Sequence, residues 1–268
     1  MRRLPALALL LLALPAWGQR PPSLEGELKQ AYADHMVILR TYYSGERLRF
    51  DAMGLPLEAG AVGAWTTDGQ ILVQDLTLAP GAIRLRGQRQ HFLFGLNGDL
   101  RHHNAGPVTV ELELAAPLRT RADAARAMAR VFLRSDEKAA DFAPAYWKFI
   151  LTHQWQSVEF ALADFLPGET LYTPGRGDVT WPKVIGRGDA LDAPIAVCGQ
   201  VEGEVGLMGV IGPDGALRAL QITDPFGLGL DDRAAAIISQ WRFQPARKGS
   251  QPVSAQVQFW IYFHRDAC

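Results

Sequence analysis

The residues that could do chemistry are few, and each lacks the neighbours that a catalytic site needs. His102 and His103 are adjacent, and adjacent side chains in a strand point to opposite faces, so the two imidazoles are poorly placed to share one metal. The Gly186-Arg187-Gly188 segment lacks the spacing of a phosphate-binding loop, and the chain has no Cys-x-x-Cys, His-Glu-x-x-His or Gly-x-Ser-x-Gly motif. Asp231 and Asp232 are more simply explained as partners of a helix dipole than as paired catalytic carboxylates. The sequence therefore predicts a non-enzymatic protein with no catalytic residue, no metal site and no cofactor.

The first residues have the pattern of an export signal. Arg2 and Arg3 precede an apolar run over 4–16, and Ala16-Trp17-Gly18 places small residues where signal peptidase cuts. The apolar run is shorter than the roughly 20 residues that a helix needs to cross a bilayer. We expect a signal peptide over 1–18, cleavage before Gln19, and a periplasmic mature chain without a transmembrane helix; an uncleaved membrane anchor is the alternative.

The charge balance argues against a nucleic-acid partner. Lys and Arg number 27 and Asp and Glu number 28. The charged residues lost with the signal are both basic, so the mature chain is more negative. Nucleic-acid-binding proteins usually carry a clustered positive surface. The densest basic group alternates with apolar residues, as the solvated face of a strand would: Arg84, Arg86, Arg89 and Arg101.

Two cysteines, Cys198 and Cys268, lie in the C-terminal part of the chain. An oxidising compartment would favour one disulfide between them. Two unpaired thiols, or pairing with another chain, are the alternatives that the sequence leaves open.

Residues 19–166 have the pattern of a β-rich domain with helices near 120–156. Short alternating runs recur at regular spacing with Gly and Pro turn signals between them, which favours a small antiparallel sheet. Thr120 is suited to an N-cap and predicts a helix over 124–133. A second helix is predicted over 143–156, with a bulky apolar face that is typical of a core. The predicted strands lie within 35–40, 48–51, 70–78, 83–87, 91–96 and 108–114, with turns at Pro80-Gly81 and Asn97-Gly98.

Residues 179–268 form a second, compact pattern after a Gly- and Pro-rich linker over 167–178. The order of elements is β-β-α-β, and the last strand alternates over its whole length. The predicted fold is α+β, with an N-terminal antiparallel β-rich domain and a helical pair followed by this small domain. Its elements are strands over 203–211 and 216–222 joined by a turn at Pro213-Asp214-Gly215, a helix opening at Leu230-Asp231-Asp232, and a strand over 252–263.

This C-terminal segment resembles the TonB C-terminal domain over roughly Val179 to His264. The combination of an acidic helix start, an aromatic helix exit and a Gly-x-x-Pro-Val strand entry is specific to the resemblance. Trp241 and Phe243 at the helix exit are expected to pack beneath the sheet. The residues that carry the likeness are Gly203-Glu204-Val205, Pro213-Asp214-Gly215, Leu230-Asp231 with Ala234, Trp241-Arg242-Phe243-Gln244-Pro245-Ala246, and Gly249 with Pro252-Val253.

The resemblance implies that the domain binds an envelope protein, such as a TonB-dependent outer-membrane transporter. If the last strand lies at a sheet edge, it could accept a strand of the partner by β-augmentation. A homodimer is an alternative, because a long last strand can exchange between chains. A classical member has a retained membrane helix and a Pro-rich spacer, whereas this chain has a cleavable-looking signal and a folded region. The predicted partner-binding residues are Val257, Phe259, Ile261 and Phe263.

The N-terminal part is similar to the region ahead of this domain in exported TonB-family proteins of acidobacterial type. Two other functions are alternatives to partner binding. A soluble carrier would hold a lipid or other apolar ligand in the N-terminal sheet, near Trp65, Phe92 and Phe94; a hydrolase in the same region is the weaker alternative. The similarity of the N-terminal part to the acidobacterial-type region rests on Leu39-Arg40, Tyr43-Ser44-Gly45, Leu48-Arg49-Phe50-Asp51 and Gly63-Ala64-Trp65-Thr66.

Overall fold

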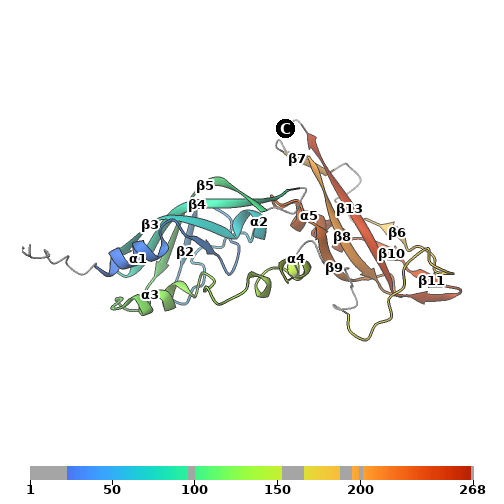
Figure 1. Ribbon diagram of the computed structural model, residues 1–268, viewed down its shortest axis with the longest axis horizontal. Helices are drawn as coiled ribbons and strands as arrows, with labels where there is room; N and C mark the ends of the chain where they lie inside the picture. The colour runs from blue at the N-terminus through green and yellow to red at the C-terminus, as the bar shows by residue number, and fades with distance from the viewer. Residues whose placement is uncertain (1–22, 96–99, 153–165, 188–194, 199–201, 267–268) are drawn as a thin grey trace, which may run out of the picture.

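The computed structural model describes residues 23–95, 100–152, 166–187, 195–198 and 202–266. The fold is α+β, as predicted. Two sheets lie at opposite ends of an elongated molecule, with α2, α4 and α5 between them (Figure 1). The predicted signal peptide and the predicted Asn97-Gly98 turn lie outside the described residues.

The N-terminal sheet has five strands in the order β1-β3-β4-β5-β2. The pairs β1–β3, β3–β4 and β4–β5 are antiparallel, but β2 pairs with β5 in parallel, so the sheet is mixed rather than wholly antiparallel. Its bounds are β1 Met36–Ile38, β2 Arg47–Phe50, β3 Gln70–Ala79, β4 Ala82–Phe94 and β5 Leu100–Glu113.

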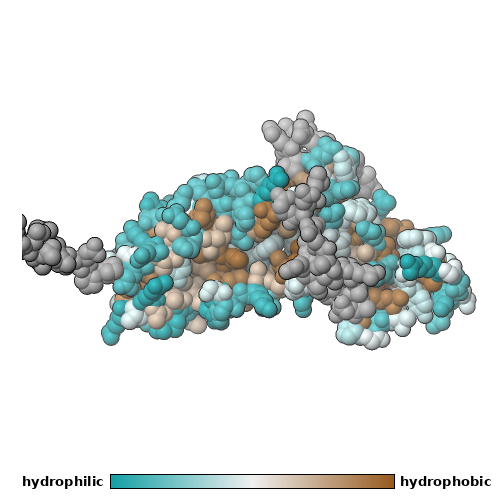
Figure 2. Space-filling model, viewed as in Figure 1, coloured by the Kyte–Doolittle hydropathy of each residue, from teal (hydrophilic) through white to brown (hydrophobic). Residues whose placement is uncertain are grey.

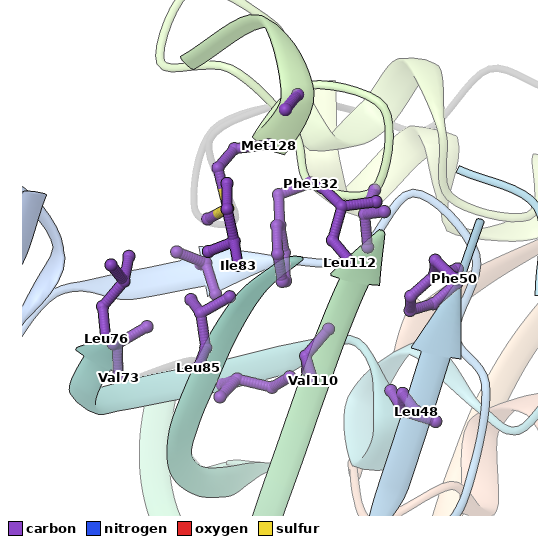
Figure 3. Packing of buried hydrophobic residues seen from close by; sticks show 14 of the residues in the cluster. Leu48, Phe50, Val73, Leu76, Ile83, Leu85, Val110, Leu112, Met128 and Phe132 are labelled. Carbon is purple, nitrogen blue, oxygen red and sulfur yellow. The ribbon is translucent and has the colours of Figure 1, made fainter. Parts of the chain in front are cut away.

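Helices cover one face of this sheet and enclose the first hydrophobic core. Leu28 of α1 (Leu24–Tyr32) and Met128 of α3 (Arg121–Met128) are both buried there. Met128 and Phe132 lie over the side chains of β3, β4 and β5 (Figure 3). The sequence pattern missed α1, because Leu28 is its only buried residue and a single apolar position gives no periodicity. A short helix, α2 (Trp65–Asp68), precedes β3.

The α3 helix begins as predicted and ends earlier than predicted. Thr120 and Asp123 form a capping box, in which each side chain bonds the other's backbone N–H. The predicted helix over 124–133 stops at Met128 because the chain turns back along β1. The Leu133 N–H donates to Ile38 O (2.9 Å) and the Arg40 N–H donates to Val131 O (2.9 Å), so this stretch extends the sheet edge.

The segment after α3 is built of short helical turns. They are the 3₁₀ turns η1 (Ala139–Asp141) and η2 (Ala145–Trp147), followed by α4 (Lys148–Thr152). The predicted single helix over 143–156 is therefore split, and its last four positions lie outside the described residues. Its predicted apolar face does pack into a core: Tyr146, Trp147, Ile150 and Leu151.

The C-terminal sheet has the order β7-β13-β8-β9, with α5 packed on one face. The predicted turn at Pro213-Asp214-Gly215 is confirmed, and Gly215 is required there because its φ is +78° and an added Cβ would lie 2.0 Å from Phe243 O. Two small antiparallel pairs, β10–β6 and the hairpin β11–β12, complete this part. The bounds are β6 Lys183–Gly186, β7 Ile195–Cys198, β8 Gly203–Ile211, β9 Leu217–Asp224, α5 Leu230–Ser239, β10 Arg242–Gln244, β11 Ala246–Lys248, β12 Gln251–Val253 and β13 Ala255–Asp266.

The two sheets are joined by one shared hydrophobic core. Trp147 of η2 is fully buried, and its ring lies 5.2 Å from that of Trp65 and 5.9 Å from that of Phe94. The same cluster includes Val205, Leu207 and Ile238 of the C-terminal part. The ring of Phe92, also in this core, packs edge-on against Trp65 (5.0 Å). The N-terminal and C-terminal parts therefore bury apolar surface against each other.

Main-chain hydrogen bonds add to this contact between the N-terminal and C-terminal parts, which we call the joint. The Phe94 N–H donates to Phe226 O (2.9 Å) and the Leu228 N–H donates to Phe92 O (2.8 Å). Gly227 lies between them with φ +99°, and a Cβ there would stand 2.2 Å from Phe92 O. The end of β4 thus continues as a short pairing with the loop that leads into α5.

Candidate partner-binding site

The last strand, β13, contains the four predicted partner-binding residues. Its side chains alternate between the two faces of the sheet, so odd-numbered residues point toward α5. Phe259, Ile261 and Phe263 are buried, and Val257 is half-buried. The Phe259 ring packs 5.8 Å from that of Phe243, which confirms the predicted aromatic packing at the helix exit. These four side chains belong to the same hydrophobic core as Ile237 and Ile238 of α5, and their part in partner binding stays a prediction.

The main chain of β13 is paired along one side, and on its other side, here called the open side, the described residues pair only with its two ends. Over 255–263 it pairs with β8 in unbroken antiparallel register. On the opposite side, the Tyr172 N–H donates to Ser254 O (2.9 Å) and the Gln256 N–H donates to Tyr172 O (3.0 Å). Even-numbered residues therefore direct their N–H and C=O groups away from β8, because successive residues of a strand alternate in this respect.

The open side runs between Tyr172 and β7. The β7 strand pairs in parallel with β13 only over 263–266. Among the described residues, no strand or hydrogen bond covers the main chain of Gln258 and Trp260 on that side. Unpaired N–H and C=O groups in a row are a template for a further strand. We call the stretch 257–262 the gap, because no described residue pairs with it on that side.

The exposed face of the sheet beside this gap carries two large aromatic residues. Trp260 is 48% exposed and Tyr262 is 42% exposed. Gly206 lies directly opposite Trp260 in β8, and an added Cβ at Gly206 would lie 2.9 Å from the indole ring. The glycine thus leaves room for the Trp260 ring to lie across the neighbouring strand. Figure 2 shows hydrophobic patches on the otherwise mostly hydrophilic C-terminal part in the view it gives.

Carboxylates gather around the two rings. Tyr262 pairs across the strands with Glu204, and its hydroxyl donates to Glu202. Asp224 of β9 lies opposite Gly206, with its Cβ 2.7 Å from where a Cβ at that glycine would stand. Burial, and then the charge of Glu204, raises the pKa of Asp224. Hydrogen bonding to Glu202 is the main cause that raises the pKa of Tyr262.

The residues ahead of β6 contact the C-terminal sheet. The main chain of Tyr172 lies alongside Ala255, Glu169 forms an ion pair with Arg218 (3.2 Å), and Val179 forms a bridge with Lys248. The predicted linker over 167–178 thus follows the surface of this domain. The proposed domain boundaries themselves stay a prediction.

The two predicted disulfide cysteines are not both described. Cys268 lies outside the described residues, and only the main chain of Cys198 is placed. That main chain lies opposite Asp266 in the β7–β13 pairing. The disulfide stays a prediction.

The aromatic residues proposed for an apolar carrier lie in the joint between the two parts. Trp65 and Phe92 are buried, and with Phe94 they pack against Trp147. The surface cavities among the described residues include one of about 650 Å³ between α1, β1 and α3 and one of about 610 Å³ beside Tyr42, Phe142 and Asp232. None of the three aromatic residues lines either of these cavities, and the carrier stays an alternative prediction.

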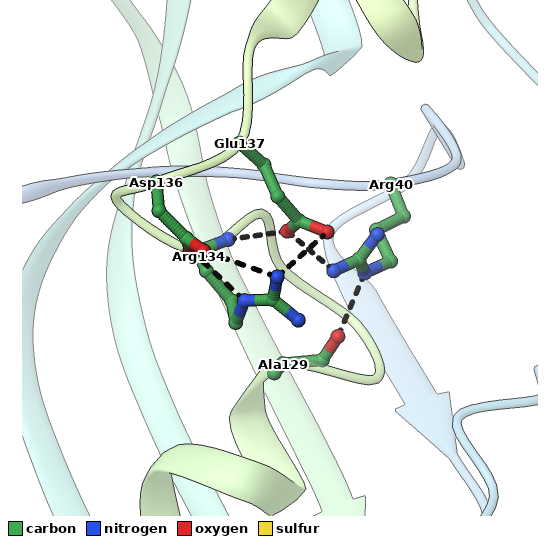
Figure 4. Close-up of polar contacts among 5 residues, drawn as sticks. All are labelled: Arg40, Ala129, Arg134, Asp136 and Glu137. Carbon is green, nitrogen blue, oxygen red and sulfur yellow. Dashed lines mark hydrogen bonds and ion pairs between the residues drawn. The ribbon is translucent and has the colours of Figure 1, made fainter.

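A polar cluster near the first cavity is satisfied by its own members. Arg40 donates from Nε to Ala129 O (2.7 Å), at the C-terminal end of α3, and pairs with Glu137 (2.5 Å) (Figure 4). Arg134 pairs with Asp136 (3.0 Å) and lies 3.8 Å from Glu137. The Arg40 guanidinium is the main cause that lowers the pKa of Glu137. This cluster ties the end of β1 to the end of α3 and has no unused charge that would bind a ligand.

Asp231 and Asp232 have roles that the helix-dipole interpretation did not foresee. Asp231 is fully buried and accepts from the N–H groups of Phe226 (2.8 Å) and Gly227 (2.6 Å), so it fixes the loop that meets β4. Burial raises the pKa of Asp231 to about 7. Asp232 accepts from the Tyr146 hydroxyl (2.9 Å), and burial raises its pKa as well. Both carboxyl groups therefore stabilise the joint, a role that local sequence spacing cannot reveal.

The described part of the chain holds no group of three or more His, Cys, Asp or Glu residues that could bind a metal ion. His102 packs edge-on against Phe92 (4.9 Å), and His91 lies opposite His103 in the β4–β5 pair. The described helices include none that is long and apolar enough to cross a membrane.

Comparison with known families agrees with the geometry of the last sheet. Residues 194–264 match the model of the family described as Gram-negative bacterial TonB protein C-terminal. This part, about a quarter of the chain, is a TonB C-terminal domain, as its motifs predicted. A comparison with curated proteins gave no match. The likeness of the N-terminal part to acidobacterial-type proteins stays a prediction.

Proposed function

We propose that this chain is a non-enzymatic protein of the periplasm that binds an envelope partner by adding a partner strand to the open edge of β13. The observation that carries the proposal is the row of main-chain groups at Gln258 and Trp260, which no described residue pairs. The TonB C-terminal domain supports an envelope location and a partner at the outer membrane. We propose a TonB-dependent transporter as that partner.

Gln258 offers a sharp test, because its N–H faces the open side and not β8. Gln258→Pro removes this donor and places a ring in the gap, yet it leaves the pairing with β8 intact. Gln258→Ala is the matched control, since it shortens the same exposed side chain and keeps the N–H.

The full chain, with either substitution, is used to recover partners from solubilised envelope. We expect the parent chain and Gln258→Ala to recover the same outer-membrane protein, and Gln258→Pro to lose it. Equal recovery by all three would refute strand addition at this edge. Light scattering of the purified parent chain and both variants measures their molar mass and so tests the homodimer. A dimer that Gln258→Pro dissociates would identify a second copy of the chain as the occupant of the edge.

A further inference from the structure

The surface cavity of about 610 Å³ lies where segments from both parts of the chain meet. The described residues that line it belong to the stretch after β1 (40–42), the stretch before α2 (62–64), the segment that leads into η2 and α4 (142–146), and α5, which contributes Asp232. The helices α2, α4 and α5 lie between the two sheets (Figure 1). Pockets for small molecules usually enclose about 300–1,000 Å³, so the cavity has the size of such a site.

The two carboxyl oxygens of Asp232 differ in their surroundings. Oδ1 accepts from the Tyr146 hydroxyl (2.9 Å) and from Trp147 Nε1 (3.3 Å). Oδ2 is buried and has no hydrogen-bond partner, and it is the one carboxylate oxygen of the described chain with both properties. Buried acceptors without a partner are rare in folded proteins because they lose their bonds to water and gain none. A donor that enters the cavity beside Asp232 would therefore gain a hydrogen bond without displacing another.

The charge on the cavity wall favours a cation. Asp232 takes part in none of the ion pairs of the described chain, whereas Arg40, which also lines the cavity, is paired with Glu137 (2.5 Å). Burial raises the pKa of Asp232, and its hydrogen bonds from Tyr146 and Trp147 oppose this shift. A positive charge in the cavity would stabilise the ionised carboxylate, and such an attraction is strong where water is largely excluded.

Aromatic side chains provide much of the remaining wall. The Arg40 guanidinium lies over the Phe142 ring, 4.9 Å from its centroid, so a ring of this wall already contacts a cation. The Tyr42 hydroxyl donates to Phe142 O (3.0 Å) and the Tyr146 hydroxyl donates to Asp232, which leaves both hydroxyl oxygens able to accept. Burial, and then the charge of Asp232, raises the pKa of Tyr42 and of Tyr146, so both hydroxyls lie near the carboxylate.

A primary ammonium group matches this set of acceptors. It has a positive charge, three N–H donors and no acceptor, and the wall offers Asp232 Oδ2 and the hydroxyl oxygens of Tyr42 and Tyr146. The apolar side chains of Val62 and Pro144 line the same cavity and suit the body of an organic amine. A metal ion is a poorer fit, because the described residues contain no group of three suitable ligands.

We propose that this cavity binds a small primary amine, whose ammonium group donates to Asp232, Tyr42 and Tyr146 and whose apolar body lies along Val62 and Pro144. The site lies away from β13, so the inference stands independently of strand addition there.

The test uses the full chain and three probes of similar shape: 2-phenylethylamine, 2-phenylethanol and 3-phenylpropanoate, which are cationic, neutral and anionic at neutral pH. Isothermal titration calorimetry measures their dissociation constants. We expect the amine to bind with a dissociation constant of about 1 mM or lower, and the other two to bind at least about tenfold more weakly. Asp232→Asn should weaken amine binding at least about tenfold. Asp224→Asn is the control, because Asp224 is a carboxylate of β9 that does not line the cavity.

A second variant keeps the test valid if Asp232→Asn loosens the joint. Val62 is 63% exposed, so Val62→Trp narrows the cavity without disturbing the core, and it should also weaken the amine at least about tenfold. Circular dichroism of each variant checks that the fold is kept.

Three results would overturn the inference. No binding of the amine to the parent chain, or equal binding of all three probes, would rule out recognition of the ammonium group. Amine binding that neither Asp232→Asn nor Val62→Trp weakens would place the amine elsewhere on the chain. Tighter binding of N-acetyl-lysine amide than of 2-phenylethylamine would identify a lysine side chain of a protein, rather than a small amine, as the occupant.

Discussion

Replacement of Trp147 by Ala should destabilise the whole chain rather than one part of it. The Trp147 ring is fully buried between the two sheets, within about 6 Å of the rings of Trp65 and Phe94. Loss of a buried Trp typically lowers the free energy of unfolding by about 3–5 kcal/mol, and each lost ring contact adds about 0.5–1.5 kcal/mol. A domain is usually stable by only about 5–15 kcal/mol, so this loss is a large fraction of the total.

Urea unfolding followed by far-ultraviolet circular dichroism and by tryptophan fluorescence provides the assay. We expect both signals of the parent chain to change together, and the midpoint for Trp147→Ala to fall by at least about 1 M urea for slopes up to about 3 kcal/mol/M. Trp181→Ala is the control, because Trp181 is 61% exposed and its loss should change stability by no more than about 0.5 kcal/mol. A loss below about 1 kcal/mol for Trp147→Ala, or a separate C-terminal transition that the substitution leaves unmoved, would refute the shared core.

Three further predictions concern the joint and the last strand. The pKa of Asp231 in the folded chain is raised from 3.8 to about 7, so its contribution to stability is fully present below about pH 4 and is lost as the pH rises through 7. Asp231→Asn should flatten this pH dependence of the free energy of unfolding in urea titrations at pH 4 to 8. An unchanged slope would contradict the prediction. Gly227→Ala should lower the free energy of unfolding by at least about 1 kcal/mol, since its φ is +99° and Phe92 O is in the way; thermal melting with no loss would contradict the pairing. Mass spectrometry of periplasmic protein should detect a peptide that links Cys198 to Cys268, whereas two free thiols would rule the disulfide out.

The sequence was a good guide wherever the signal was local. The turn at Pro213-Asp214-Gly215, the helix opening at Leu230 and the alternation of the last strand are each encoded in a few neighbouring residues. The Thr120 capping box is equally local. These features were enough to predict the α+β class and the TonB C-terminal domain.

The shared core and the pairing of β13 depend on contacts that the sequence does not show. An apolar face such as that of Tyr146 and Trp147 predicts burial, but not that the partner is α5 and β9 rather than the adjacent sheet. Alternation in the last strand likewise predicts two faces, but not which one is buried. The side chains of Phe259 and Ile261, on which the partner-binding prediction rests, face the core, whereas those of Gln258 and Trp260 are exposed.

Photo-crosslinking in the living cell tests the central claim most directly. A benzophenone amino acid at position 258 places the reactive group at the open edge, and the same group at position 236, on the exposed side of α5, serves as the control. We predict an adduct with an outer-membrane protein at 258 that is missing at 236. No adduct at 258, or the same adduct at both positions, would contradict binding at the edge of β13.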